Sequence, residues 1–198
     1  MTGRGEVGAL GLDSAGDLFA PAGAAVIELT PAGNFDATAT PAHLVATASV
    51  GAEAFLPDGQ YLVSTGLNIG RHGSAVQLER FNSNGTQDPT FNSPAFHFAA
   101  TPTDNASAIA VQPNGQVVIA GTSSNITTGG AAFGLARVNA NGSLDASFGT
   151  GGVVTTSFQG PDYATEVALQ TNGNIVVAGT SDDNSLQPSL ALARYLGQ

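Results

Sequence analysis

The sequence contains no cysteine, no tryptophan and no lysine, and a single methionine in 198 residues. Without cysteine the chain can form no disulfide, no cysteine-ligated zinc site and no thiol nucleophile, and the same absence leaves the redox compartment undecided. The first residues carry no long apolar stretch, so we expect no signal peptide in this chain and no membrane insertion.

Positive charge is also scarce. Five arginines face fifteen acidic residues, which gives a formal net charge of −10 at pH 7. An electrostatic field of this sign repels phosphate backbones, so we expect no nucleic-acid partner. The acidic, lysine-free composition, rich in Gly, Ser, Thr and Asn, favours an extracellular or cell-surface location.

What the sequence does contain is a tandem repeat. The segments AIAVQPNGQVVIAGTS (108–123) and EVALQTNGNIVVAGTS (166–181) are copies of one element, and looser copies occupy 53–66 and 10–23. The chain is therefore expected to be a single repeat array. Its units are repeat 1 (about 7–49), repeat 2 (about 50–105), repeat 3 (about 106–163) and a truncated repeat 4 (about 164–198).

Turn chemistry and alternation predict how each unit folds. An Asn-Gly pair between two alternating apolar runs is a strong hairpin signal, which we interpret here as a turn with both residues at positive φ. Within a strand, Ile109 and Val111 are expected on one face and Ala110 on the other. Unequal apolar faces suit sheets that stack on both sides. We therefore predict an all-β β-propeller of about four blades per chain, built from antiparallel meander sheets.

The second block of the repeat is LARVNANGSLDASF at 135–148, with LERFNSNGTQDPTF at 78–91. Together with the segments NGQVVIAG (114–121) and NGNIVVAG (172–179), it resembles the bacterial delta-60 repeat family over nearly the whole chain. That resemblance implies a propeller-like protein that is surface-associated or secreted in bacteria. It brings no established activity and no catalytic residues.

The strand GGVVTT occurs in fewer copies than the hairpin that precedes it, so the chain cannot complete its first blade alone. Open terminal blades would expose apolar faces and sheet edges. We therefore expect a homodimer in which two chains make a larger ring, or a chain that is part of a longer repeat array.

We interpret the repeated arginines as structural residues. Arg80 and Arg137 each precede an aspartate, Asp88 and Asp145, by eight residues across the turn, which predicts two Arg–Asp pairs. Phe91 and Phe148 recur with the repeat and are expected in the core.

The same turns weakly resemble calcium loops, because side-chain oxygens stand at alternate positions on a glycine turn. The two interpretations left open are an ordinary Asn-rich turn and a calcium site, and we otherwise expect no cofactor. The candidate metal ligands are Asn82, Asn84, Asp88, Asn139, Asn141 and Asp145.

His72 lies in a Gly-rich insertion where repeat 2 departs from the pattern. A hydrolytic Ser–His–Asp set would need His72, a serine such as Ser74 and a carboxylate such as Asp58 to meet in space. His97 is expected to be a packing or edge residue.

Four further carboxylates are expected to lie solvated in the loops between strands: Asp104, Asp162, Asp182 and Asp183.

Two functions follow from these features. The first is a non-catalytic binding or structural module of a bacterial surface or secreted protein, whose propeller loops contact a protein or glycan ligand. The alternative is a small, esterase-like hydrolase with its site in the loops of the propeller. The sequence leaves open whether the chain is catalytic.

Overall fold

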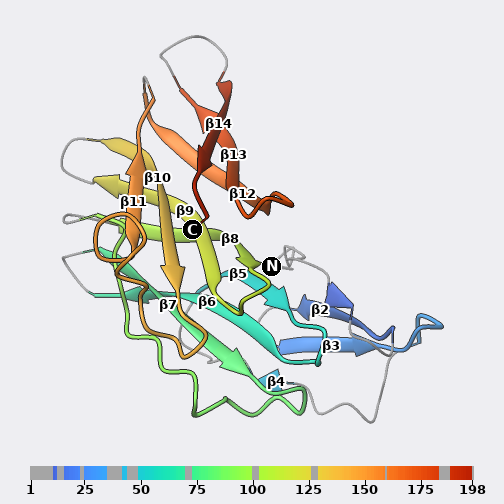
Figure 1. The fold of residues 1–198 in the computed structure, drawn as a ribbon. Helices are drawn as coiled ribbons and strands as arrows, with labels where there is room; N and C mark the ends of the chain where they lie inside the picture. The colour runs from blue at the N-terminus through green and yellow to red at the C-terminus, as the bar shows by residue number, and fades with distance from the viewer. Residues whose placement is uncertain are drawn as a thin grey trace.

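The computed structural model describes residues 11–12, 16–22, 25–34, 42–43, 49–69, 73–99, 103–125, 129–158, 160–182 and 188–197. All regular elements in these residues are β-strands (Figure 1). None of the described segments forms a helix long and apolar enough to cross a membrane. The strands are β1 (Gly11–Leu12), β2 (Leu18–Ala22), β3 (Ala25–Leu29), β4 (Ala42–His43), β5 (Ser49–Phe55), β6 (Tyr61–Asn68), β7 (Ser74–Phe81), β8 (Thr103–Val111), β9 (Val117–Asn125), β10 (Gly130–Val138), β11 (Val153–Thr156), β12 (Asp162–Leu169), β13 (Ile175–Ser181) and β14 (Ser189–Tyr195).

The strands form four antiparallel meanders, each in chain order. We call them sheet 1 (β1–β4), sheet 2 (β5–β7), sheet 3 (β8–β11) and sheet 4 (β12–β14). In sheet 2 the place of a fourth strand is taken by an isolated bridge between Val76 and Phe96, with N···O distances of 2.9 and 2.8 Å. β5, β8 and β12 contain residues 50, 106 and 164, near which repeats 2, 3 and 4 are expected to begin.

The glycine hairpins are confirmed, but their turn type differs from the expectation. Gly115 has a φ of 82°, and its amide donates to the carbonyl of Gln112 at 2.9 Å. Pro113 and Asn114 are therefore the central residues of the turn, and the proline ring fixes φ near −65°. Only the glycine takes the left-handed conformation, as in three-residue hairpin loops with a glycine bulge.

A register shift in the first strand of the sheet explains the glycine in the A-G-T-S segment of the repeat. β8 carries a register shift between Ala106 and Ala108, and β12 carries the same shift between Ala164 and Glu166. Opposite each shift stands a glycine, Gly121 or Gly179. A Cβ on Gly121 would collide with the backbone of Asn105, so the bulged strand can approach only a glycine.

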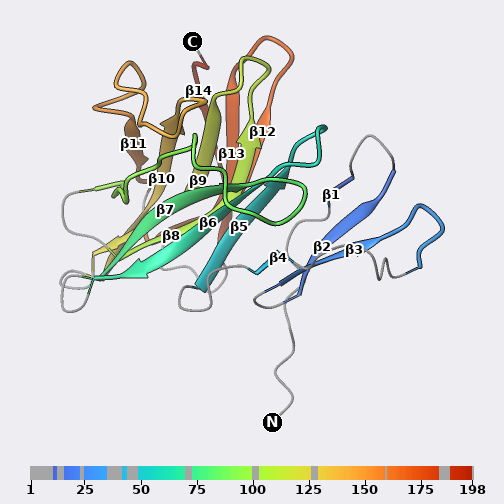
Figure 2. The same cartoon turned by 90° about the horizontal axis from the view of Figure 1, so that it is seen from below.

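The sheets pack against one another in chain order, as the views in Figures 1 and 2 show. Contacts between the first strands of successive sheets join β1 to β5, β5 to β8 and β8 to β12. These strands therefore lie innermost, as in the blades of a propeller. In the described part of the chain the row of sheets does not close into a ring (Figure 1).

Two apolar cores fill the spaces between sheets. One lies between sheets 2 and 3 and the other between sheets 3 and 4. Ile109 and Val111 pack against the first core, which confirms their predicted common face. Val167 and Leu169 pack against the second core in the same way. Phe91 and Phe148 are buried, as their recurrence predicted.

Candidate functional site

Two of the proposed hydrolytic residues, Ser74 and Asp58, lie at opposite ends of β6. His72 lies outside the described residues. Ser74 begins β7, and its Oγ donates a hydrogen bond of 2.8 Å to the backbone carbonyl of Asp104. Asp58 lies in the turn before β6, where it accepts from the amide of Gln60 at 3.1 Å. The length of β6, about 26 Å at roughly 3.3 Å per residue, separates the serine from this carboxylate.

The candidate calcium loops are hydrogen-bonded turns in the structure. Asn84 Oδ1 accepts from both the amide and the hydroxyl of Thr86, at 3.1 and 2.6 Å. Asn82 Oδ1 accepts from Gln60 Nε2 at 3.0 Å. Asn139 and Asn141 accept in the same way from Gln116 and Ser143. A cation at either loop would have to displace these donors.

The aspartates of these loops bind arginine, as predicted. Arg137 Nε lies 2.7 Å from Asp145 Oδ2, and its guanidinium lies 4.8 Å above the centre of the Phe148 ring. The Arg137 side chain is only 2% exposed. The pair is therefore desolvated, and a charged hydrogen bond there is stronger than on a surface.

We call this set of Arg137, Asp145 and Phe148 an arginine clasp, because it also holds the next sheet. Arg137 donates through Nη1 to the carbonyl of Gly197, beyond β14, at 3.0 Å. One repeat earlier, Arg80 pairs with Asp88 and donates to the carbonyl of Ala140 in sheet 3 at 3.2 Å. The two acceptors differ by 57 positions, as the two arginines do. The clasp is thus a periodic link between neighbouring sheets.

Small polar side chains complete each clasp, and sequence reasoning missed them. Thr90 donates its hydroxyl and amide to Asp88 Oδ1, and Ser147 does the same for Asp145. The Thr90 hydroxyl and amide, with the Arg80 guanidinium, lower the pKa of Asp88 to about 2. The Ser147 hydroxyl and amide, with Arg137, likewise lower the pKa of Asp145 to about 2. The recurring D-x-[ST]-F pattern was the signal that could have identified them.

Two of the carboxylates expected in solvated loops are buried, so that expectation was wrong for them. Asp104 is 1% exposed and Asp162 is 0% exposed, and they begin the inner strands β8 and β12. Each caps the preceding segment, since Oδ2 of Asp162 accepts from the amide of Phe158 at 2.7 Å. Both positions lie at the starts of strands and are removed from water there. Asp182 is exposed as expected, and Asp183 lies outside the described residues.

His97 contacts the first of these buried carboxylates. Its Nδ1 lies 2.9 Å from Asp104 Oδ2, and one-third of its side chain is exposed. Burial of Asp104 raises the pKa of its carboxyl, against the opposing effect of hydrogen bonds from Ser123, His97 and Phe98. Ser123 and His97 thus bind the same carboxylate. A nucleophilic serine would instead bond to the imidazole, so this cluster links sheets 2 and 3 and lacks the triad arrangement.

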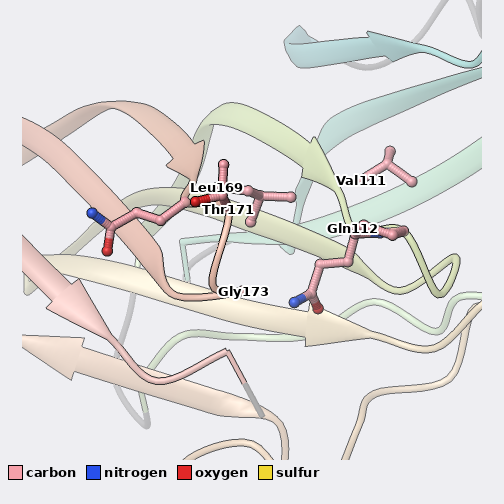
Figure 3. A pocket seen from close by; sticks show the side chains of 7 residues that line it. Val111, Gln112, Leu169, Thr171 and Gly173 are labelled. Carbon is pink, nitrogen blue, oxygen red and sulfur yellow. The ribbon is translucent and has the colours of Figure 1, made fainter.

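A groove of about 310 Å³ opens at the other end of the sheets, between two of the glycine turns. Figure 3 shows Val111 and Gln112 on one side and Leu169 and Thr171 on the other. Gln112 is 6% exposed; its Nε2 donates to the carbonyl of Gly197, and its Oε1 has no partner among the described residues. The groove combines an apolar lining with a fixed amide, as small ligand sites do.

Comparison with protein families gives one match. Residues 112–148, which span the clasp of the third repeat, fit the family described as "Domain of unknown function (DUF5122) beta-propeller". A comparison with curated proteins gave no match.

Two of the solved structures that resemble this chain align with TM-scores above 0.5. A protein of unknown function from Bacteroides caccae aligns with a TM-score of 0.56 at 15% identity, over 99% of this chain and 62% of that one. PorZ, a bacterial surface component of the type-IX secretion system of Porphyromonas gingivalis, aligns with a TM-score of 0.51 at 18% identity. That alignment covers 97% of this chain and 26% of PorZ. The chain thus spans less than two thirds of either protein.

At these identities the likenesses concern the fold alone. The family match, the meandering sheets and the inner row of strands agree with one another. This chain is a propeller-like, all-β repeat protein.

Proposed function

We propose that the chain is a non-catalytic binding or structural module of a bacterial surface or secreted protein, with about four blades per chain and a place among the delta-60 repeats. The arginine clasp is the observation that carries this proposal. In two successive repeats, the arginine of a buried or half-buried ion pair joins one sheet to the next. The surface location rests on the acidic composition and on the resemblance of the repeat.

We assign the proposed binding role to the groove between the two glycine turns, beside the clasp of the third repeat. Arg137 and Gln112 both donate to the carbonyl of Gly197, at 3.0 and 3.3 Å. This carbonyl therefore holds the third repeat against the fourth beside the groove between the glycine turns. A volume of about 310 Å³ accommodates one apolar side chain or one sugar ring. A protein or glycan ligand would contact the groove through Val111, Leu169 and Thr171.

The binding role is tested with labelled protein on a panel of bacterial surface glycans and short peptides. Thr171→Arg fills the groove from an exposed position, so we expect this variant to lose the binding that the wild type shows. Asn84→Arg places the same side chain on an exposed turn of sheet 2 and serves as the matched control. Equal binding by all three proteins would remove the groove from the proposal.

The non-catalytic part is tested with a chromogenic short-chain ester. We expect no hydrolysis above the buffer rate for the wild type, His97→Ala or His72→Ala. A wild-type rate that either substitution abolishes would instead support the hydrolase.

A further inference from the structure

The outer face of sheet 4 carries large apolar side chains in contact with solvent. Leu190 and Leu192 of β14 are 77% and 57% exposed. They alternate with Ala191, which is buried against sheet 3. Both leucines therefore point away from sheet 3.

The repeat shows what such a face does elsewhere in this protein. A spacing of 57 residues places Leu190 and Leu192 at the positions of Phe133 and Leu135 in sheet 3. Phe133 and Leu135 are both 0% exposed, because sheet 4 packs over them with its inner strand β12 and with Ile175 of β13. Sheet 4 thus carries, on its outer side, a copy of the face that receives a further sheet.

The arginine of the repeat gives a second indication of an uncovered face. Arg194 stands at the position of Arg137, but it is exposed and forms no ion pair within the described residues. The third arginine of the repeat is thus free to reach a carbonyl of a docked sheet.

We propose that the outer face of sheet 4, formed by Leu190, Leu192 and Arg194 of β14, docks a sheet from a second copy of this chain. The occupant follows from continuity with the interface between sheets 3 and 4. What covers Phe133 and Leu135 is a whole sheet of this repeat, and each copy of the chain offers such sheets. The inference rests on the propeller-like module proposed above and names its partner.

The test is sedimentation velocity of the 198-residue chain from about 1 to about 100 µM, where dimers form by mass action. We expect the wild type to dimerise, and more strongly in added salt, because each copy carries a net charge of −10. Leu190→Asp with Leu192→Asp should weaken the dimer at least about tenfold. Ile69→Asp, an exposed apolar residue beside β6 in sheet 2, is the control and should leave the dimer intact.

Circular dichroism and urea unfolding of the monomeric variant should match the wild-type monomer, since both leucines are exposed. A wild type that remains monomeric at the highest concentration overturns the proposal. So does a dimer that survives the double substitution, because it must use another surface. Either result leaves the ester and ligand assays, and thus the proposed function, to be judged separately.

A cover from within the same chain is a further outcome that the experiment detects. Leu192→Cys introduces the only thiol of the protein. We expect this thiol to react quickly with a maleimide at low concentration and slowly at high concentration. Protection at every concentration in a monomer would mean that the chain covers its own face, which overturns docking of a second copy.

Discussion

Sheets 3 and 4 are built from the same repeat, yet they differ in what surrounds them. Sheet 3 lies between two apolar cores, and its arginine, Arg137, is 2% exposed. Sheet 4 has one covered face, and the equivalent Arg194 is exposed together with Leu190 and Leu192. The same pattern is therefore core in one sheet and surface in the next. A side chain of this repeat is therefore buried only where a neighbouring sheet of the array packs over it.

The largest difference in unfolding free energy is expected when each of the two arginines is removed separately. Arg137→Ala leaves the buried Asp145 carboxylate without its cation, and breaking such a pair costs about 3–5 kcal/mol of unfolding free energy. Arg194→Ala changes an exposed side chain and should alter stability by about 0.5 kcal/mol or less. Urea unfolding of both variants measures the difference. Equal losses would mean that the clasp does not hold sheet 3 in place.

A smaller effect is expected at a glycine that only sheet 3 requires. Gly134 lies against the ring of Phe98 from sheet 2, and a Cβ there would collide with that ring. Sheet 4 has Ala191 at the equivalent position, buried against sheet 3. Gly134→Ala should cost about 1–3 kcal/mol through overpacking, measured as a lower midpoint in thermal or urea unfolding. A variant as stable as the wild type would show that Phe98 moves aside freely.

Acid should weaken the clasps over a defined range. The pKa of Asp145 is about 2 in the folded chain, below its value of about 3.9 in an unfolded one. A lowered pKa contributes stability that is present above about pH 4 and is lost as the pH falls towards about 2. Asp145→Asn should therefore flatten the decline in unfolding free energy over this range. An unchanged slope would contradict a role for this carboxylate.

The carboxyl of Asp104 should change the stability with pH in the direction opposite to that of Asp145. Burial raises the pKa of its carboxyl, so its contribution is greatest at low pH and declines as the pH rises through the raised value. Asp104→Asn is therefore expected to steepen the acid loss slightly, which the same titration measures. A shallower loss in this variant would mean that the carboxylate is stabilised in the fold.

The smallest expected effect is that of calcium. The oxygens of Asn84 and Asn141 already accept hydrogen bonds within their turns. Millimolar calcium should therefore leave the melting temperature unchanged, and a chelator should not lower it. A clear rise with calcium would show that these turns bind the ion, because a ligand that binds the folded state raises its stability.

Several of these features could be predicted from local patterns. The eight-residue spacing of Arg80 and Arg137 from their aspartates gave both ion pairs, because the turn folds the two ends of that segment together. The carbonyls that the same arginines hold in the following sheet could not be predicted. Ala140 and Gly197 offer only backbone oxygens, and no residue type marks them.

The buried aspartates show the same limit. Asp104 and Asp162 are of a residue type that is common in loops. Nothing nearby in the sequence indicates that a neighbouring sheet removes them from water. Likewise, Ser74 and Asp58 stand only 16 positions apart, but a full strand lies between them.

The sequence by itself determined the meander, the glycine of each turn and the face on which each apolar residue lies. These depend on turn chemistry and on the two-residue period of a strand, which act over a few neighbouring positions. Only the tertiary structure decided which copy of a repeated residue is buried, and where the arginine of one repeat finds its acceptor in the next. Those outcomes require a second sheet to be in place, and identical local sequence carries no information about whether it is.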